Sequence, residues 1–203
     1  MRVVVPFATV DPKTRLSGPL DPEERREFSR AMLGDVLESV REAGGEPEVL
    51  ATAPLDVDTP ATVDDRPLTE AVNAALEPET AVVMADLPLL TAETIEGLFE
   101  TPGDVVLAPG RGGGTNALLS REPEFRVDYH GGSFLKHRAS ASEIGSVGVV
   151  DSHRLATDID EPADLVEVLI HGEGRAVQWL REAGFSLVRT ESRLAVDRAP
   201  DGR

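Results

Sequence analysis

Apolar positions fall into two kinds of pattern along this chain. Short continuous runs such as Val3-Val4-Val5 predict strands that are buried on both faces of a sheet. Stretches with apolar residues three or four positions apart predict amphipathic helices, and the longest covers residues 22–43. The predicted strands are 2–6, 48–51, 81–85, 104–108, 147–150 and 185–188, with shorter candidates at 116–119 and 125–127. The predicted helices are 22–43, 69–76, 91–99, 133–142, 162–170 and 174–183.

Strands alternate with helices through most of the chain, which favours a mainly parallel sheet with helices on both faces. A chain of 203 residues is long enough for one ordinary core. We therefore expect a single α/β domain over residues 1–197 and a disordered tail over residues 198–203. Ligands of such sheets bind beyond the carboxyl ends of the strands, so the loops after strands 2–6, 81–85 and 104–108 are the first candidates for chemistry.

Composition adds a strongly acidic surface to this fold. The formal net charge is −17 while apolar residues make up 40% of the chain, which indicates a folded acidic domain and not a disordered chain. Because salt screens repulsion among surface acids, we expect a cytoplasmic protein of a salt-loving organism. The chain has no basic stripe for nucleic acid and no apolar run of membrane-spanning length. It also has no cysteine, which excludes disulfides, thiolate metal sites and cysteine nucleophiles.

Lysine is nearly absent, since Lys13 and Lys136 are the two lysines among 20 basic residues. Lys13 follows the first strand and precedes Arg15 by two positions, and such a pair suits a phosphate group. The alternative is a solvated basic loop, and the loop lacks the Gly-Lys-Ser/Thr of a Walker A motif. The role of Lys136 stays open between a substrate contact and a surface position. His130 and His137 are expected on the surface, because neither has a convincing metal partner in the sequence.

Three aspartates are candidate metal ligands. Asp86 ends the strand at 81–85, and a carboxylate at that edge suits Mg²⁺, a hard cation that prefers oxygen ligands. Asp158 and Asp160 are two positions apart, so in an extended segment their side chains share a face and can complete a site with Asp86. The structural alternatives are a turn aspartate at 86, a helix cap at 160 before Pro162 and a solvated acid at 158.

Two glycine-rich segments are candidate anion sites. Residues 110–116 include Thr115, and the glycines there let backbone N–H groups approach an anion. This segment does not match the dinucleotide-binding fingerprint. Gly131-Gly132-Ser133 opens a predicted helix, and a helix N-terminus is a ready anion site. The alternatives are a flexible connection and simple helix capping by Ser133.

Taken in chain order, these segments resemble the 2-phospho-L-lactate guanylyltransferase family of deazaflavin coenzyme F-420 biosynthesis. The segments are 12–16 (PKTRL), 85–90 (ADLPLL), 113–118 (GGTNAL), 132–134 (GSF) and 158–165 (DIDEPADL). The resemblance implies a single-domain, three-layer α/β/α nucleotidyltransferase fold, GT-A-like and Rossmann-related, with a mainly parallel mixed sheet. The molybdenum-cofactor guanylyltransferases open with Leu-Ala-Gly-Gly, whereas this chain continues through Pro6-Phe7-Ala8, which favours the phospholactate branch.

The resemblance also implies a reaction. GTP and 2-phospho-L-lactate would give lactyl-2-diphospho-5'-guanosine and pyrophosphate, with Mg²⁺ as cofactor and with Lys13, Arg15 and Asp86 in catalysis. The implied contacts are Lys13, Arg15 and Asn73 for the nucleotide, Asp86, Asp158 and Asp160 for the metal, and Thr115, Gly132 and Ser133 for the acceptor phosphate.

Two functional alternatives stay open at this point. A nucleotidyltransferase of this kind can use phosphoenolpyruvate or another small phosphorylated acid as the acceptor. A protein of this fold can also bind a nucleotide without turnover, although the three candidate metal acids are present. The apolar segment at 177–188 can pack on the domain or on a second copy, which leaves a homodimer open.

Overall fold

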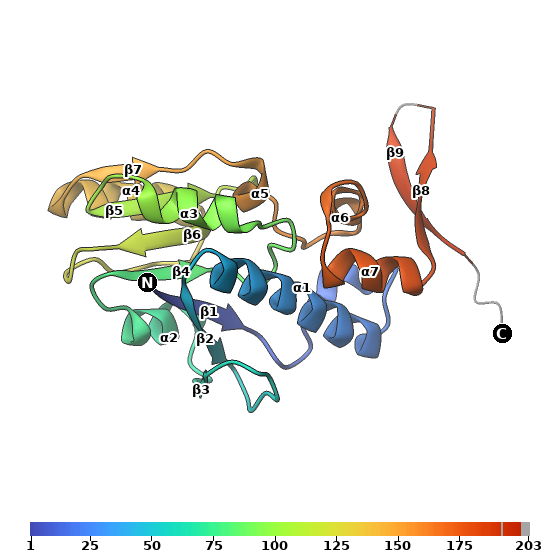
Figure 1. Ribbon diagram of the computed structural model, residues 1–203, viewed down its shortest axis with the longest axis horizontal. Coiled ribbons are helices and arrows are strands. Elements are labelled where there is room, and N and C mark those ends of the chain that lie inside the picture. Colours follow the sequence, from blue (N-terminus) through green and yellow to red (C-terminus); the bar gives the residue numbers. More distant parts are fainter. Residues whose placement is uncertain (192, 200–203) are drawn as a thin grey trace.

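The computed structural model describes residues 1–191 and 193–199, and a seven-stranded sheet of order β3-β2-β1-β4-β6-β5-β7 forms its centre (Figure 1). Its strands are β1 (Arg2–Phe7), β2 (Glu46–Ala51), β3 (Ala61–Val63), β4 (Thr80–Val83), β5 (Val105–Pro109), β6 (Thr115–Ser120) and β7 (Val147–Val149). The helices are α1 (Pro22–Glu42), α2 (Leu68–Ala75), α3 (Ala92–Glu100), α4 (Ser133–Ile144), α5 (His153–Ala156), α6 (Leu165–His171) and α7 (Arg175–Glu182), with 3₁₀ turns η1 (Thr14–Leu16) and η2 (Pro162–Asp164). A separate hairpin pairs β8 (Phe185–Arg189) with β9 (Leu194–Arg198).

The sheet is mixed and mainly parallel, which confirms the predicted fold class. β1 is parallel to β2 and β4, β2 to β3, and β5 to β7, whereas β6 is antiparallel to β4 and β5. At the centre, Val4 is in register with Glu48 on one side and with Val82 on the other. The carboxyl ends of β1, β2 and β4 therefore lie at one edge of the sheet, where a ligand site is expected.

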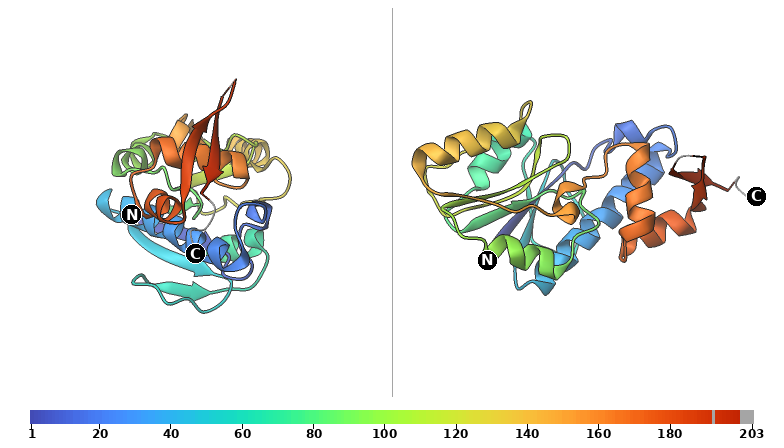
Figure 2. Two further views of the ribbon diagram at one scale, coloured as in Figure 1. Left: turned by 90° about the vertical axis from the view of Figure 1, so that its right-hand side faces the viewer. Right: turned by 90° about the horizontal axis from the view of Figure 1, so that it is seen from above.

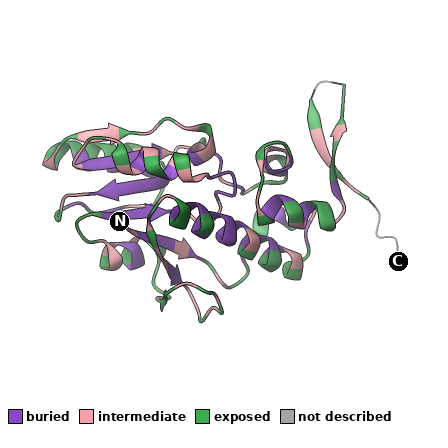
Figure 3. Cartoon of the chain, in the orientation of Figure 1, coloured by how far each residue is buried: buried purple, intermediate pink, exposed green. Residues whose placement is uncertain are grey.

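Helices cover both faces of the sheet and complete the three layers (Figure 2). Successive residues of β1 point to opposite faces, so Val3 and Val5 join an apolar cluster with α1, α3 and α5, and Val4 joins a cluster with α2 and α4. The central strands are buried along most of their length (Figure 3). No helix among the described residues is both long enough and apolar enough to cross a membrane.

A third apolar cluster lies beyond the end of the sheet, where α1 packs against α6 and α7 (Figure 1). Phe28 of α1 and Trp179 of α7 form its aromatic contact, with ring centroids 5.4 Å apart. Val177 and Leu180 are buried in the same cluster. These side chains of the apolar C-terminal segment therefore pack within the chain, on α1.

The β8–β9 hairpin extends the ordered chain past the predicted tail boundary. Arg198 ends β9, and its guanidinium donates to the carbonyl oxygens of Ala183 and Pro19 and pairs with Glu24 on α1. Of the predicted tail, residues 200–203 lie outside the described residues.

Several local predictions were wrong for identifiable reasons. Residues 125–127 form no strand; Phe125 and Val127 are buried, but the backbone of Val127 pairs with the Asn73 amide and not with a strand. Gly132, and not Ser133, occupies the N-cap of α4, at φ 66°, a left-handed conformation that glycine adopts readily. The predicted helix 162–170 begins as the 3₁₀ turn η2. β3, α5 and β9 were not predicted.

Candidate active site

The loop after β1 is held in a strained conformation that aims Lys13 into a cleft. Asp11 and Lys13 have φ values of 42° and 54°, which non-glycine residues seldom adopt. Arg25 of α1 is buried beneath this loop, and it donates to the Asp11 carboxylate at 2.5 Å and to the Pro12 carbonyl oxygen at 3.1 Å. The hydrogen bonds from Arg25 thus offset the conformational free energy that the loop backbone costs.

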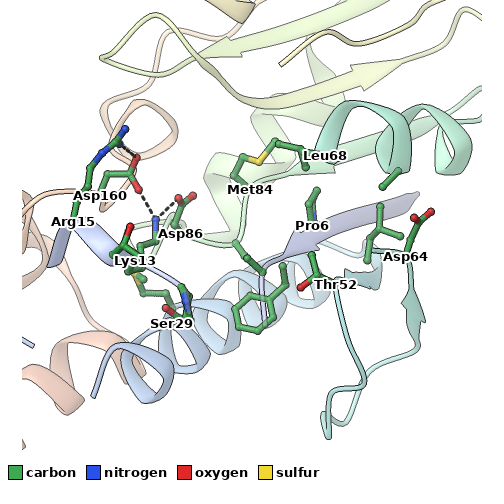
Figure 4. Close-up of a pocket in the computed structure, with 18 of the residues that line it drawn as sticks. Pro6, Lys13, Arg15, Ser29, Thr52, Asp64, Leu68, Met84, Asp86 and Asp160 are labelled. Carbon is green, nitrogen blue, oxygen red and sulfur yellow. Dashed lines mark hydrogen bonds and ion pairs between the residues drawn. The ribbon is translucent and has the colours of Figure 1, made fainter. Parts of the chain in front are cut away.

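Lys13 lies between two of the predicted metal acids (Figure 4). Its Nζ donates to Asp86 Oδ2 at 2.5 Å and to Asp160 Oδ1 at 2.7 Å. Arg15 reaches the other oxygen of Asp160 at 3.2 Å, and its side chain is 69% exposed. The structure therefore brings together the predicted cations Lys13 and Arg15 with the predicted acids Asp86 and Asp160.

Backbone contacts bring the third acid, Asp158, to the same edge. The N–H of Ile159 donates to the Asp86 carbonyl oxygen at 3.0 Å, which fixes segment 158–160 beside the end of β4. Asn116 of β6 donates from its side-chain amide to Asp158 Oδ1 and to the Leu155 carbonyl oxygen, both at 3.0 Å. All three acids therefore converge.

The helix-capping alternative for Asp160 was wrong, because the adjacent turn is closed by another acid. Asp164 Oδ2 accepts from the N–H groups of Asp160 and Glu161 at 3.1 and 2.8 Å. The side chain of Asp160 is left to face the two cations.

The electrostatics of this cluster follow from burial and like charge. Burial raises the pKa of Asp86, the ammonium of Lys13 opposes the rise, and Asp160 and Asp158 reinforce it. Burial alone would lower the pKa of Lys13, but the charges of Asp86 and Asp160 outweigh burial and raise it. Lys13 is therefore a permanent cation that compensates a group of mutually repelling carboxylates.

The acids also fit a hard divalent cation. Asp86 Oδ1 is buried and has no hydrogen-bond partner among the described residues. A buried carboxylate oxygen without a partner is costly unless a cation approaches it. Oxygen atoms from Asp86, Asp158 and Asp160 are the ligands that Mg²⁺ prefers, and the cleft that Asp86 and Asp160 line has room for water and phosphate oxygens.

Thr115 and Ser133, predicted to hold an acceptor phosphate, lie together on the other face of the sheet edge. Each side chain belongs to a residue that is 3% exposed. The Thr115 N–H donates to Ser133 Oγ at 2.9 Å, and Ser133 Oγ lies 3.4 Å from Thr115 Oγ1. Since neighbouring residues of a strand point to opposite faces, Thr115 faces α4 while Asn116 faces the Asp158 segment.

His137 is buried and fixes the Thr115 hydroxyl, so its predicted surface position was wrong. The N–H of Asp128 donates to His137 Nε2 at 2.7 Å, and the other ring nitrogen, Nδ1, lies 2.9 Å from Thr115 Oγ1. Burial lowers the pKa of His137 to about 4, so the ring is neutral at pH 7. With Nε2 accepting, Nδ1 carries the proton and donates to the Thr115 hydroxyl oxygen.

The glycines beside Thr115 and Ser133 form an open backbone edge. A Cβ atom added at Gly112, Gly113, Gly131 or Gly132 would meet no atom within 4 Å. The N–H of Phe134 donates to the Gly113 carbonyl oxygen at 3.2 Å and ties the two glycine segments together. An anion can therefore approach this backbone closely.

The remaining predicted positions lie outside these clusters. Asn73 lies on α2, and its amide pairs with both backbone groups of Val127, at 2.9 and 2.8 Å. Lys136 is on the surface of α4 and pairs with Asp128 at 2.7 Å.

A cleft of about 420 Å³ extends from the Lys13 cluster along the carboxyl ends of β1, β2 and β4. At one end lie Lys13, Arg15, Asp86 and Asp160; at the far end Asp64 and Leu68 lie across from Thr52 (Figure 4). Asp64 is paired with Arg66, which lowers its pKa. The lining between the two ends is mainly apolar and includes Pro6, Phe7 and Met84.

Sequence reasoning missed three residues that shape the site: Arg25, Asn116 and His137. Arg25 is the fourth residue after the N-cap of α1. Asn116 follows Thr115 in β6 and so points to the opposite face, and His137 lies four residues after Ser133 in α4. The strand and helix periods could have placed Asn116 and His137 near the predicted site, but the sequence gives no sign that His137 is buried.

A cation pair facing carboxylates at the carboxyl edge of a mixed α/β sheet suits the binding of phosphate groups and a divalent cation. Solved structures agree with this class of fold: a nucleotidyl transferase from Methanothermobacter matches with a TM-score of 0.58 at 14% identity, over 89% of this chain and 98% of that one. A Desulfovibrio desulfuricans protein described as a nucleotide-diphospho-sugar transferase matches with a TM-score of 0.67 at 16% identity, over 89% of this chain and 94% of that one.

The family is defined by sequence. Residues 1–199 match the family described as guanylyl transferase CofC like, and the chain belongs to this family. A 2-phospho-L-lactate guanylyltransferase of Halomicrobium mukohataei is 56% identical, over 98% of this chain and all of its own length. Proteins of the same name from Natronomonas pharaonis (98% and 99% covered) and Haloferax volcanii (96% and 97%) are 57% and 58% identical.

Proposed function

We propose that this protein transfers GMP from GTP to 2-phospho-L-lactate and releases pyrophosphate. The single observation that carries the proposal is the convergence of Lys13 and Arg15 with Asp86 and Asp160 at one end of a cleft, beside the segment that carries Asp158. Relatives named for this reaction, at 50–58% identity, supply the choice of substrates.

The reaction needs positioning and charge neutralisation more than proton transfer. An oxygen of the acceptor phosphate is already anionic, so it can attack the α-phosphorus of GTP without a strong general base. A bond forms between that oxygen and the α-phosphorus as the bond to the β-phosphate oxygen breaks, and pyrophosphate leaves with the electron pair. Holding both phosphates in line supplies a large part of the rate.

Lys13 and Arg15 are proposed to stabilise the leaving pyrophosphate. Lys13 already has two anionic partners, Asp86 and Asp160, so phosphate oxygens would replace or share them at little electrostatic cost. Arg15 is exposed enough to swing towards the triphosphate. Mg²⁺ held by Asp86, Asp158 and Asp160 would neutralise negative charge on the reacting phosphates when bound.

The acceptor phosphate is proposed to bind at the open glycine edge. Gly113 and Gly132 leave open space beside their backbone there, and the buried Thr115 and Ser133, which hydrogen-bond to one another, hold the two glycine segments together. This edge and the Asp158 segment are joined through consecutive residues of β6, because Thr115 serves one and Asn116 the other. The two reacting phosphates would therefore meet across the end of β6.

The far end of the cleft is proposed to bind the guanine base. The Asp64 carboxylate is paired with Arg66, but each carboxylate oxygen can accept a further hydrogen bond, and the two together match the adjacent N1–H and 2-amino donors of guanine. Adenine lacks this pair of donors and would leave these acceptor positions without a partner on the base. Leu68 and Met84 supply an apolar surface for the base.

The experiment is product analysis by mass spectrometry. The protein would be incubated with Mg²⁺, GTP or ATP, and phospholactate, phosphoenolpyruvate or phosphoglycerate in separate reactions. Formation of lactyl-diphospho-guanosine from GTP and phospholactate is expected. If phosphoenolpyruvate gave the dominant product, it would be the acceptor in place of 2-phospho-L-lactate. Nucleotide binding without product in any reaction would overturn the catalytic proposal.

A further inference from the structure

Three side chains that commonly bind metals converge between α5 and α6, outside the cleft. His153 opens α5, and Glu167 and His171 lie one turn apart on α6. One ligand atom from each lies within 4.8 Å of the others. Residues at i and i+4 share a helix face, so α6 presents two ligands together and α5 supplies the third.

The distances suit a shared ion better than direct pairing. His153 Nε2 and His171 Nε2 lie 3.4 and 3.7 Å from Glu167 Oε2. A charge-assisted hydrogen bond would bring such atoms to about 2.7–2.9 Å. Ligand atoms at the corners of a tetrahedron around Zn²⁺ lie about 3.3 Å apart when each bond is about 2.0–2.1 Å. The two distances to Glu167 are thus close to the spacing of a metal coordination shell.

The donor set indicates the chemical class of the ion. Two imidazoles and one carboxylate favour a first-row transition ion, whereas Mg²⁺ prefers oxygen ligands alone. The side chains are 54%, 27% and 45% exposed for His153, Glu167 and His171, so an ion and a water molecule can reach them. The rings of the two histidines meet edge to face, at 5.4 Å and 78°, and leave their Nε2 atoms on the side of Glu167.

We propose that His153, Glu167 and His171 form a second metal site, for a divalent transition ion such as Zn²⁺. Its three protein ligands leave a fourth position for water. The site joins α5 to α6 and thereby brackets residues 157–161, the segment that carries Asp158 and Asp160. A bound ion would act as a clamp that restrains this segment from outside the cleft.

The test is a Zn²⁺ titration against a chromophoric chelator, with excess Mg²⁺ present to occupy the aspartate cluster. The Asp86→Asn protein would be titrated in parallel, and it should keep the site. His153→Ala and His171→Ala should each weaken Zn²⁺ binding at least about tenfold, since each removes one ligand. His130→Ala, which removes an exposed histidine elsewhere, is the matched control and should bind as the unmodified protein does.

Two further readouts separate loss of the site from loss of the fold. Zn²⁺ should raise the thermal midpoint of the unmodified protein and of the His130→Ala variant, but not that of His171→Ala or Glu167→Gln. Co²⁺ in place of Zn²⁺ should give the intense visible bands of a four-coordinate ion. Equal Zn²⁺ affinity in the unmodified protein and in His153→Ala/His171→Ala, with unchanged circular dichroism, would overturn the proposal.

Discussion

Lys13 and Lys136 differ in burial and in partners, although both are lysines of a lysine-poor chain. Lys13 is 12% exposed and bonded to two acids of the cleft, whereas Lys136 is 46% exposed and pairs with Asp128 on the surface of α4. Lys13→Ala should lower kcat by about 10²- to 10³-fold, the usual effect of removing one group that stabilises transition-state charge. Pyrophosphate release measures this, with Lys136→Ala as the control that stays within a few-fold of the unmodified rate. A Lys13→Ala protein of near-normal rate would exclude its catalytic role.

Asp86 is the candidate metal acid with a buried carboxylate oxygen that has no hydrogen-bond partner among the described residues. Asp86→Asn keeps the shape of the side chain but removes its charge and one oxygen ligand, so the Mg²⁺ concentration that gives half-maximal activity should rise at least about tenfold. Chelation by EDTA should abolish activity in the unmodified protein, and Mg²⁺ should restore it. A Mg²⁺ titration that superimposes on that of the unmodified protein would show that Asp86 is not a ligand.

His137 should make the protein sensitive to acid. Its pKa of about 4 in the fold lies below the ordinary 6.5, so the unfolded chain takes up a proton first as the pH falls. Stability from this group is present above pH 6.5 and is lost towards pH 4, by about 2–3 kcal/mol at pH 4.5. Urea unfolding at pH 7 and 4.5 should therefore show a smaller acid-induced loss for His137→Asn than for His130→Asn, which changes an exposed histidine. Equal losses in the two variants would contradict the assignment.

The candidate site was partly predictable from residue chemistry. Lys13, Asp86 and Asp160 follow predicted strands or a short extended segment, and the rule that ligands bind at the carboxyl edge was enough to group them. Arg25 and His137 could not be assigned, because their roles come from burial against partners 14 and 22 residues away, Asp11 and Thr115. Only tertiary packing brings Arg25 and His137 to the loop and the strand that they hold in place.

At the level of elements, one helix caps another. Asp35, in the middle of α1, is buried and accepts from the N–H groups of Arg175 and Ala176 at the start of α7, at 2.6 and 2.9 Å. Gly174 is required beside it, since a Cβ there would come within 2.3 Å of Asp35 Oδ1. Burial raises the pKa of Asp35 in spite of these bonds. Asp35 thus fixes the C-terminal helix to the core.

Asp35→Ala should destabilise the protein by about 1–3 kcal/mol, because it strands two N–H donors at a helix start. Asp35→Asn keeps one acceptor oxygen and should lose less. Glu38→Ala is the matched control: Glu38 is exposed on the same helix and its pair with Arg175 spans 3.4 Å, so little change is expected. The measurement is the midpoint of urea unfolding for each variant, compared at an unchanged m-value. Equal midpoints for Asp35→Ala and Glu38→Ala would contradict the capping role.

The elements that were predicted correctly are those with strong periods. The sequence marks both ends of α1. Asp21 and Glu24 form a capping box at its start, and Gly44, with φ 74°, follows its end. β3 was missed because it is three residues long and wholly exposed. β9 was missed because its inward and outward positions carry both apolar and charged residues, and its partner β8 lies outside the main sheet.

At the scale of the whole molecule, the surface is acidic because few of the acidic residues are used in the core or in the cleft. The buried residues are mainly Val, Leu and Ala, and the cleft uses Lys13 and Arg15, so most of the 37 acids remain on the surface. These acids outnumber the 20 basic residues, so they cannot each be paired with a separate cation. Folding gathers these charges, and their repulsion acts against the compact state.

Salt should therefore stabilise the fold by screening this repulsion. The Debye length falls from about 10 Å at 0.1 M to about 3 Å at 1 M salt, so the thermal midpoint should rise between those concentrations of KCl. Sucrose at matched osmolality separates screening from solute exclusion and should give a smaller rise. Glu96 and Glu100 are exposed, like-charged and four positions apart on α3, so Glu96→Gln/Glu100→Gln should raise the midpoint at low salt and reduce the increment from KCl. A midpoint that falls on going to molar KCl, or a KCl increment that is unchanged in the double variant, would show that surface repulsion does not limit this protein.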